Sequence, residues 1–160
     1  MRNGLPATAL RRLIDTNILI YEIDSKDRAK QRRAFQILER ARPAPGTGLT
    51  SQILAEFASA SMRRPVPPLG PAEARRHVER LSHEFHVLPV TPICVSEALR
   101  GVEIHQFSFW DALIWAVARL NQVPVVLTED LPGGQTWIDG VRYANPIDPS
   151  FDLDRIGADL

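Results

Sequence analysis

The stretch Leu13-Ile14-Asp15-Thr16-Asn17-Ile18-Leu19-Ile20-Tyr21 decides how this chain folds. Its apolar run predicts a buried strand followed by a turn or the start of a helix. Taking an ionised carboxylate out of water is costly unless the charge is paired or bound to a metal. Asp15 therefore has two interpretations: it caps the next helix, or it is a metal ligand at the carboxyl end of a strand, where open α/β sheets bind their ligands.

The composition is that of a single globular domain. The chain has 160 residues, of which 44% are apolar and 24% charged, values that are ordinary for such proteins. No apolar run approaches the roughly 20 residues that a membrane-spanning helix needs, and residues 1–12 lack the apolar core of a secretory signal. The single cysteine, Cys94, excludes an intramolecular disulfide. We therefore expect a cytoplasmic protein without membrane association.

Charge is spread unevenly along the chain, although the formal net charge is zero. Residues 1–80 contain 15 Lys and Arg against 8 Asp and Glu, whereas from Glu129 onward there are 7 acids and 2 Arg. A basic first half can bind a polyanion while the whole chain stays neutral. Solvated helix faces would give the same counts.

Helical and strand patterns alternate, which predicts a mainly parallel sheet. Apolar residues at 3- and 4-residue spacing, caps and Pro or Gly breaks give the boundaries. We expect strands at 13–14, 48–50, 86–90, 123–127 and 141–147, and helices at 25–41, 51–60, 72–85, 92 to about 103, and 108–121. The last of these helices is apolar nearly all round and should be buried. The segment from Asp148 should be an acidic, weakly structured tail.

Four acidic side chains interrupt apolar surroundings. Asp15 breaks the first strand, and Glu56 lies at the edge of the apolar face of its helix. Asp111 is the only acid in the apolar helix, and Asp130 follows the third main strand. If the first and third main strands are parallel, Asp15 and Asp130 emerge at the same rim of the sheet. Hard divalent cations prefer several such oxygen ligands.

Each acid also has a structural explanation. Glu56 can be a solvated border residue, and Asp130 an ordinary turn residue. Asp111 occupies the third position of a helix that Ser108 would cap, a variant of the capping box. Taken together, four such coincidences at sites expected to converge favour one metal site over four separate structural roles.

Other chemistries have little support in the sequence. The four histidines have no Cys or His partner at zinc-ligand spacing. The chain has no phosphate-binding Gly-rich loop, no dinucleotide turn and no nucleophile elbow. A haloacid-dehalogenase-like phosphatase needs a second Asp two residues after its nucleophile, where this chain has Asn17.

These motifs together resemble the PIN-domain family, and within it the VapC-like ribonuclease toxins of type II toxin–antitoxin systems. The resemblance covers about residues 12–147 and rests on the order and spacing of several strings. They are Asp15-Thr16-Asn17, Glu56 in a helix, Phe109-Trp110-Asp111-Ala112-Leu113-Ile114, Leu127-Thr128-Glu129-Asp130-Leu131, and Asn145-Pro146. The resemblance implies a three-layer α/β/α fold with a mainly parallel central sheet. It divides the chain into an N-terminal lead-in (1–11), a PIN-like nuclease domain (12–147) and an acidic C-terminal tail (148–160).

The resemblance also implies a site and an activity. Asp15, Glu56, Asp111 and Asp130 match the family's acidic quartet, which would bind Mg²⁺ or Mn²⁺ and hydrolyse RNA by a metal-activated water. Thr16, Asn17 and Thr128 match the supporting polar residues, whereas Glu129 is left out as a ligand. The basic first half would hold the RNA backbone. Its candidate residues are Arg28, Lys30, Arg32, Arg33, Arg63 and Arg64.

The implied partners are an RNA substrate, a small cognate antitoxin that blocks the pocket, and a second copy of the chain in a homodimer. An alternative is a catalytically inactive PIN-like module that binds RNA or protein without cutting. The capping explanation for Asp111 keeps this alternative open.

Overall fold

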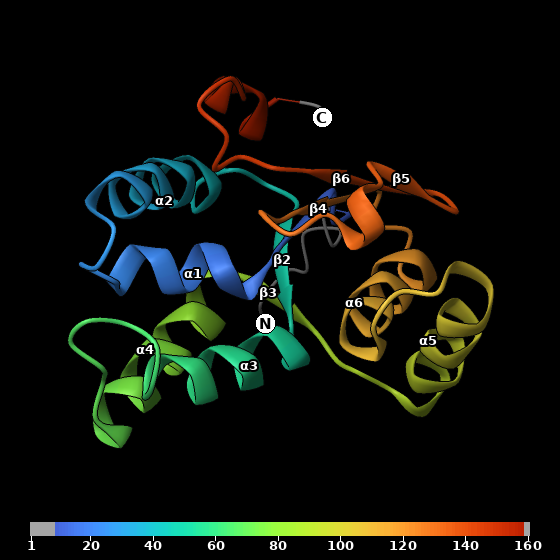
Figure 1. Ribbon diagram of the computed structural model, residues 1–160, viewed down its shortest axis with the longest axis horizontal. Helices are drawn as coiled ribbons and strands as arrows, with labels where there is room; N and C mark the ends of the chain where they lie inside the picture. The colour runs from blue at the N-terminus through green and yellow to red at the C-terminus, as the bar shows by residue number, and fades with distance from the viewer. Residues whose placement is uncertain (1–8, 159–160) are drawn as a thin grey trace, which may run out of the picture.

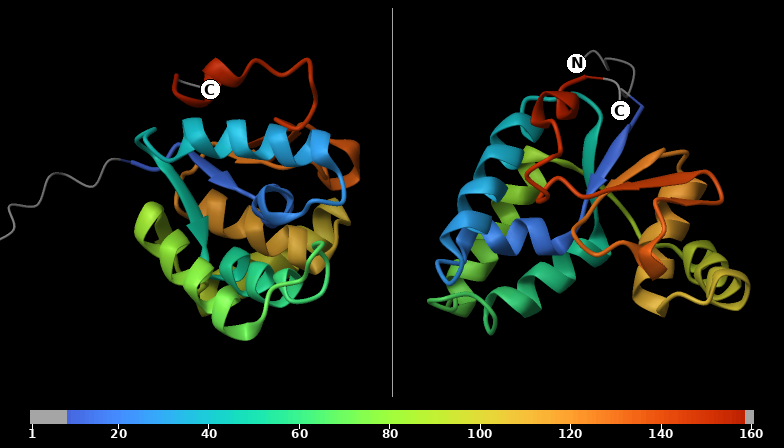
Figure 2. Two further views of the ribbon diagram at one scale, coloured as in Figure 1. Left: turned by 90° about the vertical axis from the view of Figure 1, so that its left-hand side faces the viewer. Right: turned by 45° about the horizontal axis from the view of Figure 1, so that its top comes forward.

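The computed structural model describes residues 9–158, which form a six-stranded sheet between two layers of helices (Figures 1 and 2). Helices α1 to α4 cover one face, and α5 and α6 cover the other, so the predicted three-layer α/β/α fold is confirmed. The strands are β1 (Arg12–Ile14), β2 (Thr47–Thr50), β3 (His86–Leu88), β4 (Val125–Leu127), β5 (Trp137–Ile138) and β6 (Val141–Ala144). The helices are α1 (Thr16–Ile23), α2 (Arg28–Ala41), α3 (Ser51–Ser61), α4 (Pro71–Glu84), α5 (Pro92–His105) and α6 (Phe109–Leu120), with short 3₁₀ turns η1 (Pro132–Gly134) and η2 (Leu153–Ile156).

The sheet has the strand order β3-β2-β1-β4-β6-β5. Every neighbouring pair is parallel except β5 and β6, so the mainly parallel sheet that we predicted is confirmed. β1 lies between β2 and β4, with Ile14 opposite Leu127. The chain therefore leaves β1 and β4 at neighbouring points of the same rim.

Side-chain caps fix where most helices begin. Thr50 accepts a hydrogen bond from the Ile53 amide at the start of α3, and Ser108 accepts one from the Asp111 amide at the start of α6. Asp27 accepts from two amides at the start of α2, which therefore begins three residues later than predicted. The apolar run that begins in β1 continues into α1, so the predicted helix start after Asp15 is confirmed.

Helix α6 packs between the sheet and α5. Its residues from Ala112 to Ala118 are all buried, whereas Trp110 near its beginning is 62% exposed. Gly101 of α5 allows the close approach, because a β-carbon there would lie 2.8 Å from the Trp115 ring. The predicted burial of this helix is confirmed for its central turns. Among the described residues, no helix combines the length and hydropathy that a membrane crossing requires.

Besides the later start of α2, the predicted strands at 86–90, 123–127 and 141–147 are shorter, because only His86–Leu88, Val125–Leu127 and Val141–Ala144 pair in the sheet. Two larger features also differ from the sequence prediction. Strand β5 was not predicted, because two residues are too few to show a pattern; it pairs antiparallel with β6 through a turn at Asp139-Gly140, both of which have positive φ. The predicted weakly structured tail is wrong for residues 148–158, which form η2 and bury Leu153 and Ile156. Most of the predicted N-terminal lead-in, residues 1–8, lies outside the described residues.

Arginine side chains attach this C-terminal segment to the domain. Arg33 of α2 donates hydrogen bonds to the backbone carbonyls of Pro146, Asp148 and Phe151. Arg12 of β1 donates to the carbonyl of Ala158. Figure 1 shows the segment lying next to α2. The acidic residues of the segment face solvent, while its apolar residues complete the core.

This packing predicts a stability effect of the C-terminal segment. Ile156 is fully buried, so Ile156→Ala should lower the free energy of unfolding by about 2–4 kcal/mol in chemical denaturation. Asp154→Ala is the matched control, because that side chain is exposed and makes one long ion pair with Arg40; its effect should be below about 0.5 kcal/mol. Equal, small effects of both substitutions would contradict the packing.

Candidate active site

The ends of β1 and β4 bring the first two site residues together. The Asp15 amide donates to the Leu127 carbonyl at 2.9 Å, which continues the parallel ladder by one residue. The Thr128 amide in turn donates to the Ala144 carbonyl of β6. The side chains that follow these two strands therefore lie side by side, and the Thr128 hydroxyl donates to Asp15 Oδ2 at 2.8 Å.

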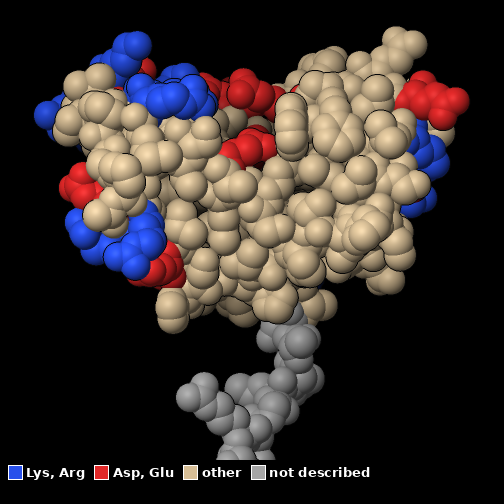
Figure 3. All heavy atoms as spheres, turned by 90° about the horizontal axis from the view of Figure 1, so that it is seen from below, with Lys and Arg blue, Asp and Glu red and all other residues tan. Residues whose placement is uncertain are grey.

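A cavity of about 300 Å³ opens at this rim. Figure 3 shows acidic side chains in a recess, with basic side chains on one side of it and uncharged surface on the other. The lining residues are Asp15, Thr16, Asn17, Glu56, Ala60, Arg63, Arg64, Trp110, Asp111, Ile114 and Asp130. All four acids singled out in the sequence thus reach one cavity, from the end of β1, from α3, from α6 and from the loop after β4.

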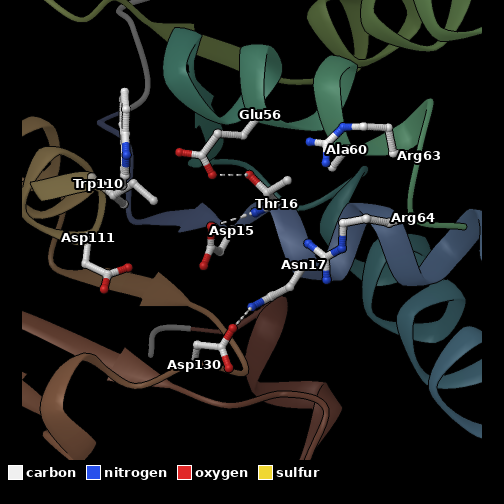
Figure 4. A pocket seen from close by; sticks show the side chains of 11 residues that line it. Asp15, Thr16, Asn17, Glu56, Ala60, Arg63, Arg64, Trp110, Asp111 and Asp130 are labelled. Atoms are coloured by element: carbon white, nitrogen blue, oxygen red, sulfur yellow. Dashed lines mark hydrogen bonds between the residues drawn. The ribbon is translucent and has the colours of Figure 1, made fainter. Parts of the chain in front are cut away.

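Each polar residue of the first motif is bound to a different part of the site (Figure 4). The Thr16 hydroxyl donates to Glu56 Oε2 at 3.3 Å. The Asn17 amide group donates to Asp130 Oδ2 and to Thr128 Oγ1, both at 3.3 Å. One turn of α1 therefore orients acids that are 40 and 113 residues away in the sequence.

Asp15 carries an incompletely compensated charge. It is the N-cap of α1, because its Oδ1 accepts from the Thr16 amide at 2.7 Å. Burial raises the pKa of Asp15 to about 6, against the lowering effect of the bonds from Thr128 and Thr16. The nearby carboxylates of Glu56 and Asp111 raise it further. The capping role and the buried-charge role of Asp15 therefore coexist.

Asp111 lies in the first turn of α6, beside Ser108. The Ser108 hydroxyl donates to Asp111 Oδ2 at 2.8 Å, and the Asp111 amide donates back to Ser108 Oγ at 3.2 Å. Asp111 therefore takes part in the N-terminal cap of α6, as its structural explanation predicted. Its carboxylate nevertheless lines the cavity and is half-buried, so one of its oxygens is still free to face the other acids.

Glu129 and the basic residues of α2 lie apart from this cavity. Glu129 accepts hydrogen bonds from the Tyr21 hydroxyl and from Lys30, which agrees with leaving it out of the acidic set. Lys30, Arg32 and Arg33 line a separate cavity between α2 and the start of the C-terminal segment. Arg28 bonds to Gln31 on the exposed surface of α2. Of the six basic candidates, the structure places Arg63 and Arg64 at the acidic cavity.

Comparison with known proteins identifies the family. A sequence model of the PIN domain matches residues 12–131. The chain belongs to the PIN-domain family. No curated protein matches it. Solved structures with a similar fold include the toxin VapC20 of Mycobacterium tuberculosis, described as cleaving the sarcin-ricin loop, at 20% identity and a TM-score of 0.58 over 72% of this chain and 86% of that one.

Two further structures cover more of this PIN domain. The DNA-bound VapBC of Salmonella typhimurium matches at 20% identity with a TM-score of 0.60, over 86% of this chain and 98% of that one. PAE2754 of Pyrobaculum aerophilum matches at 20% identity with a TM-score of 0.62, over 95% of this chain and 98% of that one. At these identities the likeness shows the fold alone.

Three site residues of the PIN domain were not identified from the sequence. Gln52 donates to Glu56 Oε1 and to the Trp110 carbonyl, and so connects α3 to α6; its signal was its position four residues before Glu56 on the same helix face. Trp110 directly precedes Asp111 and projects into the cavity wall. Tyr143 of β6 lies beneath the acids: burial and the charges of Asp111 and Asp15 raise the pKa of its hydroxyl, which has no hydrogen-bond partner within the described chain.

The donor set of the PIN domain fits a hard divalent cation bound partly through water. Carboxylate oxygens are the ligands such ions prefer, and Mg²⁺ commonly keeps several waters while taking only one or two carboxylates directly. Within residues 9–158, no three Asp, Glu, His or Cys side chains converge closely enough to hold one ion between them. Direct coordination by one or two acids, with the others reached through water, is compatible with that arrangement. A cation would also offset the buried charge of Asp15.

The raised pKa of Asp15 predicts how stability depends on pH in chelator-treated protein. The folded state holds the Asp15 proton up to about pH 6, whereas the ordinary pKa is 3.8. Between these values the folded state binds more protons than the unfolded state, so the free energy of unfolding falls as pH rises. This shift corresponds to a loss of roughly 3 kcal/mol across the window.

Asp15→Asn should remove most of that slope and be more stable than the wild type at pH 7, as measured by urea denaturation between pH 4 and 7. Glu103→Gln, an exposed change on α5, should keep the wild-type slope. Parallel pH profiles for the wild type and Asp15→Asn would contradict the assignment.

Proposed function

We propose that this PIN domain is a metal-dependent endoribonuclease that hydrolyses RNA phosphodiester bonds, and that it is the toxin of a toxin–antitoxin pair. The observation that carries the proposal is the arrangement of Asp15, Glu56, Asp111 and Asp130 around one cavity. Burial and like charge together raise the pKa of Asp15. Such clustering is unfavourable for the fold alone and is typical of a site that binds a cation.

In this proposal Asp15 and Asp111 are the principal ligands of Mg²⁺ or Mn²⁺, followed by Asp130 and then Glu56. When bound, the ion supplies a Lewis acid that lowers the pKa of water and neutralises charge on a phosphate oxygen. Thr128 and the Thr16 amide hold Asp15 in position, and Asn17 holds Asp130. Glu56 is oriented by Gln52 and Thr16, and in this proposal one of the acids would accept a proton from the attacking water. The products would carry a 5′-phosphate and a 3′-hydroxyl.

RNA backbone binding falls to the basic side of the cavity. Arg63 and Arg64 are exposed on the chain segment that follows α3 and line the same cavity as the acids. Guanidinium groups bind phosphate oxygens through charge-assisted hydrogen bonds. Contacts of this kind make binding salt-dependent.

Family membership and fold support the toxin assignment. VapC20 is a toxin, and VapBC structures share the fold with this chain over most of its length. We propose by analogy a small cognate antitoxin that covers the acidic cavity, and a homodimer in the cytoplasm. Co-expression with such an antitoxin should relieve the toxicity of this chain.

A PIN-like module that binds RNA or protein without cutting is the second candidate. It is favoured by the engagement of Asp111 with Ser108 and by the lack of a three-acid cluster within the described residues. In that case the acids would serve the cap and the fold, and their replacement would leave the biological effect of the protein intact.

The two candidates differ in how they respond to charge removal. Asp15→Asn and Asp111→Asn should each lower the Mn²⁺-dependent cleavage rate of a labelled RNA at least about 100-fold, because each removes a ligand oxygen. Both should also abolish toxicity on induction in cells. Glu103→Gln should retain wild-type activity.

Circular dichroism checks that each variant has the same secondary structure as the wild type. Absence of RNA cleavage by the wild type with either cation, together with unchanged toxicity of Asp15→Asn, would refute the nuclease and support the binding module.

A further inference from the structure

A large aromatic side chain lies exposed at the edge of the acidic cavity. Trp110 is 62% exposed although it belongs to α6, whose central turns are buried and apolar. It lines the cavity and is the residue directly before Asp111. Leaving an indole in water forfeits the free energy that its burial would provide. Because Trp110 lies beside the acids, its exposed ring is available to a ligand bound in the cavity.

The backbone of Trp110 is anchored, and its ring has an aromatic neighbour. The backbone carbonyl of Trp110 accepts a hydrogen bond from Gln52 Nε2 at 3.0 Å, and its ring packs edge-on against Phe109, with centroids 5.4 Å apart at 71°. Gln52 also bonds to Glu56. The backbone of Trp110 is therefore tied to both α6 and α3, and Phe109 contacts one edge of its ring.

The opposite side of the cavity is basic. Figure 4 shows Trp110 on one side of the carboxylates and Arg63 and Arg64 on the other. The Arg63 guanidinium donates to Ser59 at 3.1 Å, and among residues 9–158 neither Arg63 nor Arg64 forms an ion pair. The cavity thus presents an aromatic wall, an acidic floor and a wall with two uncompensated positive charges.

These three surfaces match one stretch of single-stranded RNA. We propose that Trp110 stacks on an unpaired base next to the phosphate that is cleaved, while Arg63 and Arg64 bind backbone phosphates on the other side. Aromatic rings stack on bases that are splayed out of a helix, and bases within a duplex are not accessible in this way. This inference rests on the proposed nuclease function and assigns Trp110 as the residue that positions the base beside the cleaved bond.

Binding without cleavage tests the stacking directly. The test uses the full chain with Asp15→Asn, which prevents cleavage and removes one repelling charge, in chelator, with a labelled 12-nucleotide unpaired RNA. Adding Trp110→Leu should weaken binding about 5- to 100-fold, the range for loss of one base–aromatic stack. Trp110→Tyr should restore most of the affinity, because it restores an aromatic face.

The chain offers a matched control. Trp137 on β5 is 59% exposed, nearly as much as Trp110, but it does not line the acidic cavity. Trp137→Leu should leave the affinity unchanged. RNA binding should also quench the indole fluorescence of Trp110, and this quenching should disappear in Trp110→Leu but persist in Trp137→Leu.

A coupling experiment locates the base. An RNA with one abasic nucleotide beside the cleaved bond should bind the parent protein as weakly as the intact RNA binds Trp110→Leu. The two changes together should cost little more than either alone, because both remove the same stack.

Equal RNA affinity of the Trp110→Leu and Trp137→Leu proteins would overturn the inference. Failure of the nuclease proposal is distinguishable, because it removes cleavage by the wild type while the chelator binding assay still reports on Trp110. Loss of affinity in Trp110→Leu that Trp110→Tyr fails to restore would also count against stacking.

Discussion

The carboxylate of Asp15, at the end of the central strand β1, is the constraint on which the site depends. Its register beside β4 brings it next to Thr128, and its position as N-cap of α1 brings Thr16 and Asn17 to the same rim. Two hydrogen bonds reduce the cost of burying this charge but do not remove it, as the raised pKa shows. In the proposed function a bound cation supplies the remaining compensation, and this is why we assign the rim a chemical rather than a purely structural role.

The first motif organises the site by hydrogen bonding. Thr16 orients Glu56 and Asn17 orients Asp130, so a single helical turn connects α3 and the loop after β4 to Asp15. Gln52 extends this network to α6 through the Trp110 carbonyl. The acids and the backbone of Trp110 are consequently connected through one hydrogen-bond network. The proposed stacking of a base on Trp110 would use this connection to place the base beside the acids.

Much of this arrangement was predictable because burial leaves a pattern in sequence. An acid inside an apolar run, as at Asp15 or Asp111, is visible without a structure, and alternating helices and strands imply a parallel sheet with a common rim. Strand β5 was too short to show a pattern, although Asp139-Gly140 is a turn signal. The C-terminal segment was misjudged because its acids mask two buried residues, Leu153 and Ile156. The role of Trp110 depends on the direction its side chain takes, which helical periodicity alone did not reveal.

The central claim is that the four acids form one cation site, and anomalous diffraction from crystals grown with Mn²⁺ tests it most directly. The account predicts an anomalous peak inside the cavity, bonded to Asp15 or Asp111, with the other acids in direct or water-mediated contact. The peak should vanish in crystals of Asp15→Asn grown under the same conditions. A cavity without a peak at saturating Mn²⁺, or a peak that persists unchanged in Asp15→Asn, would contradict it.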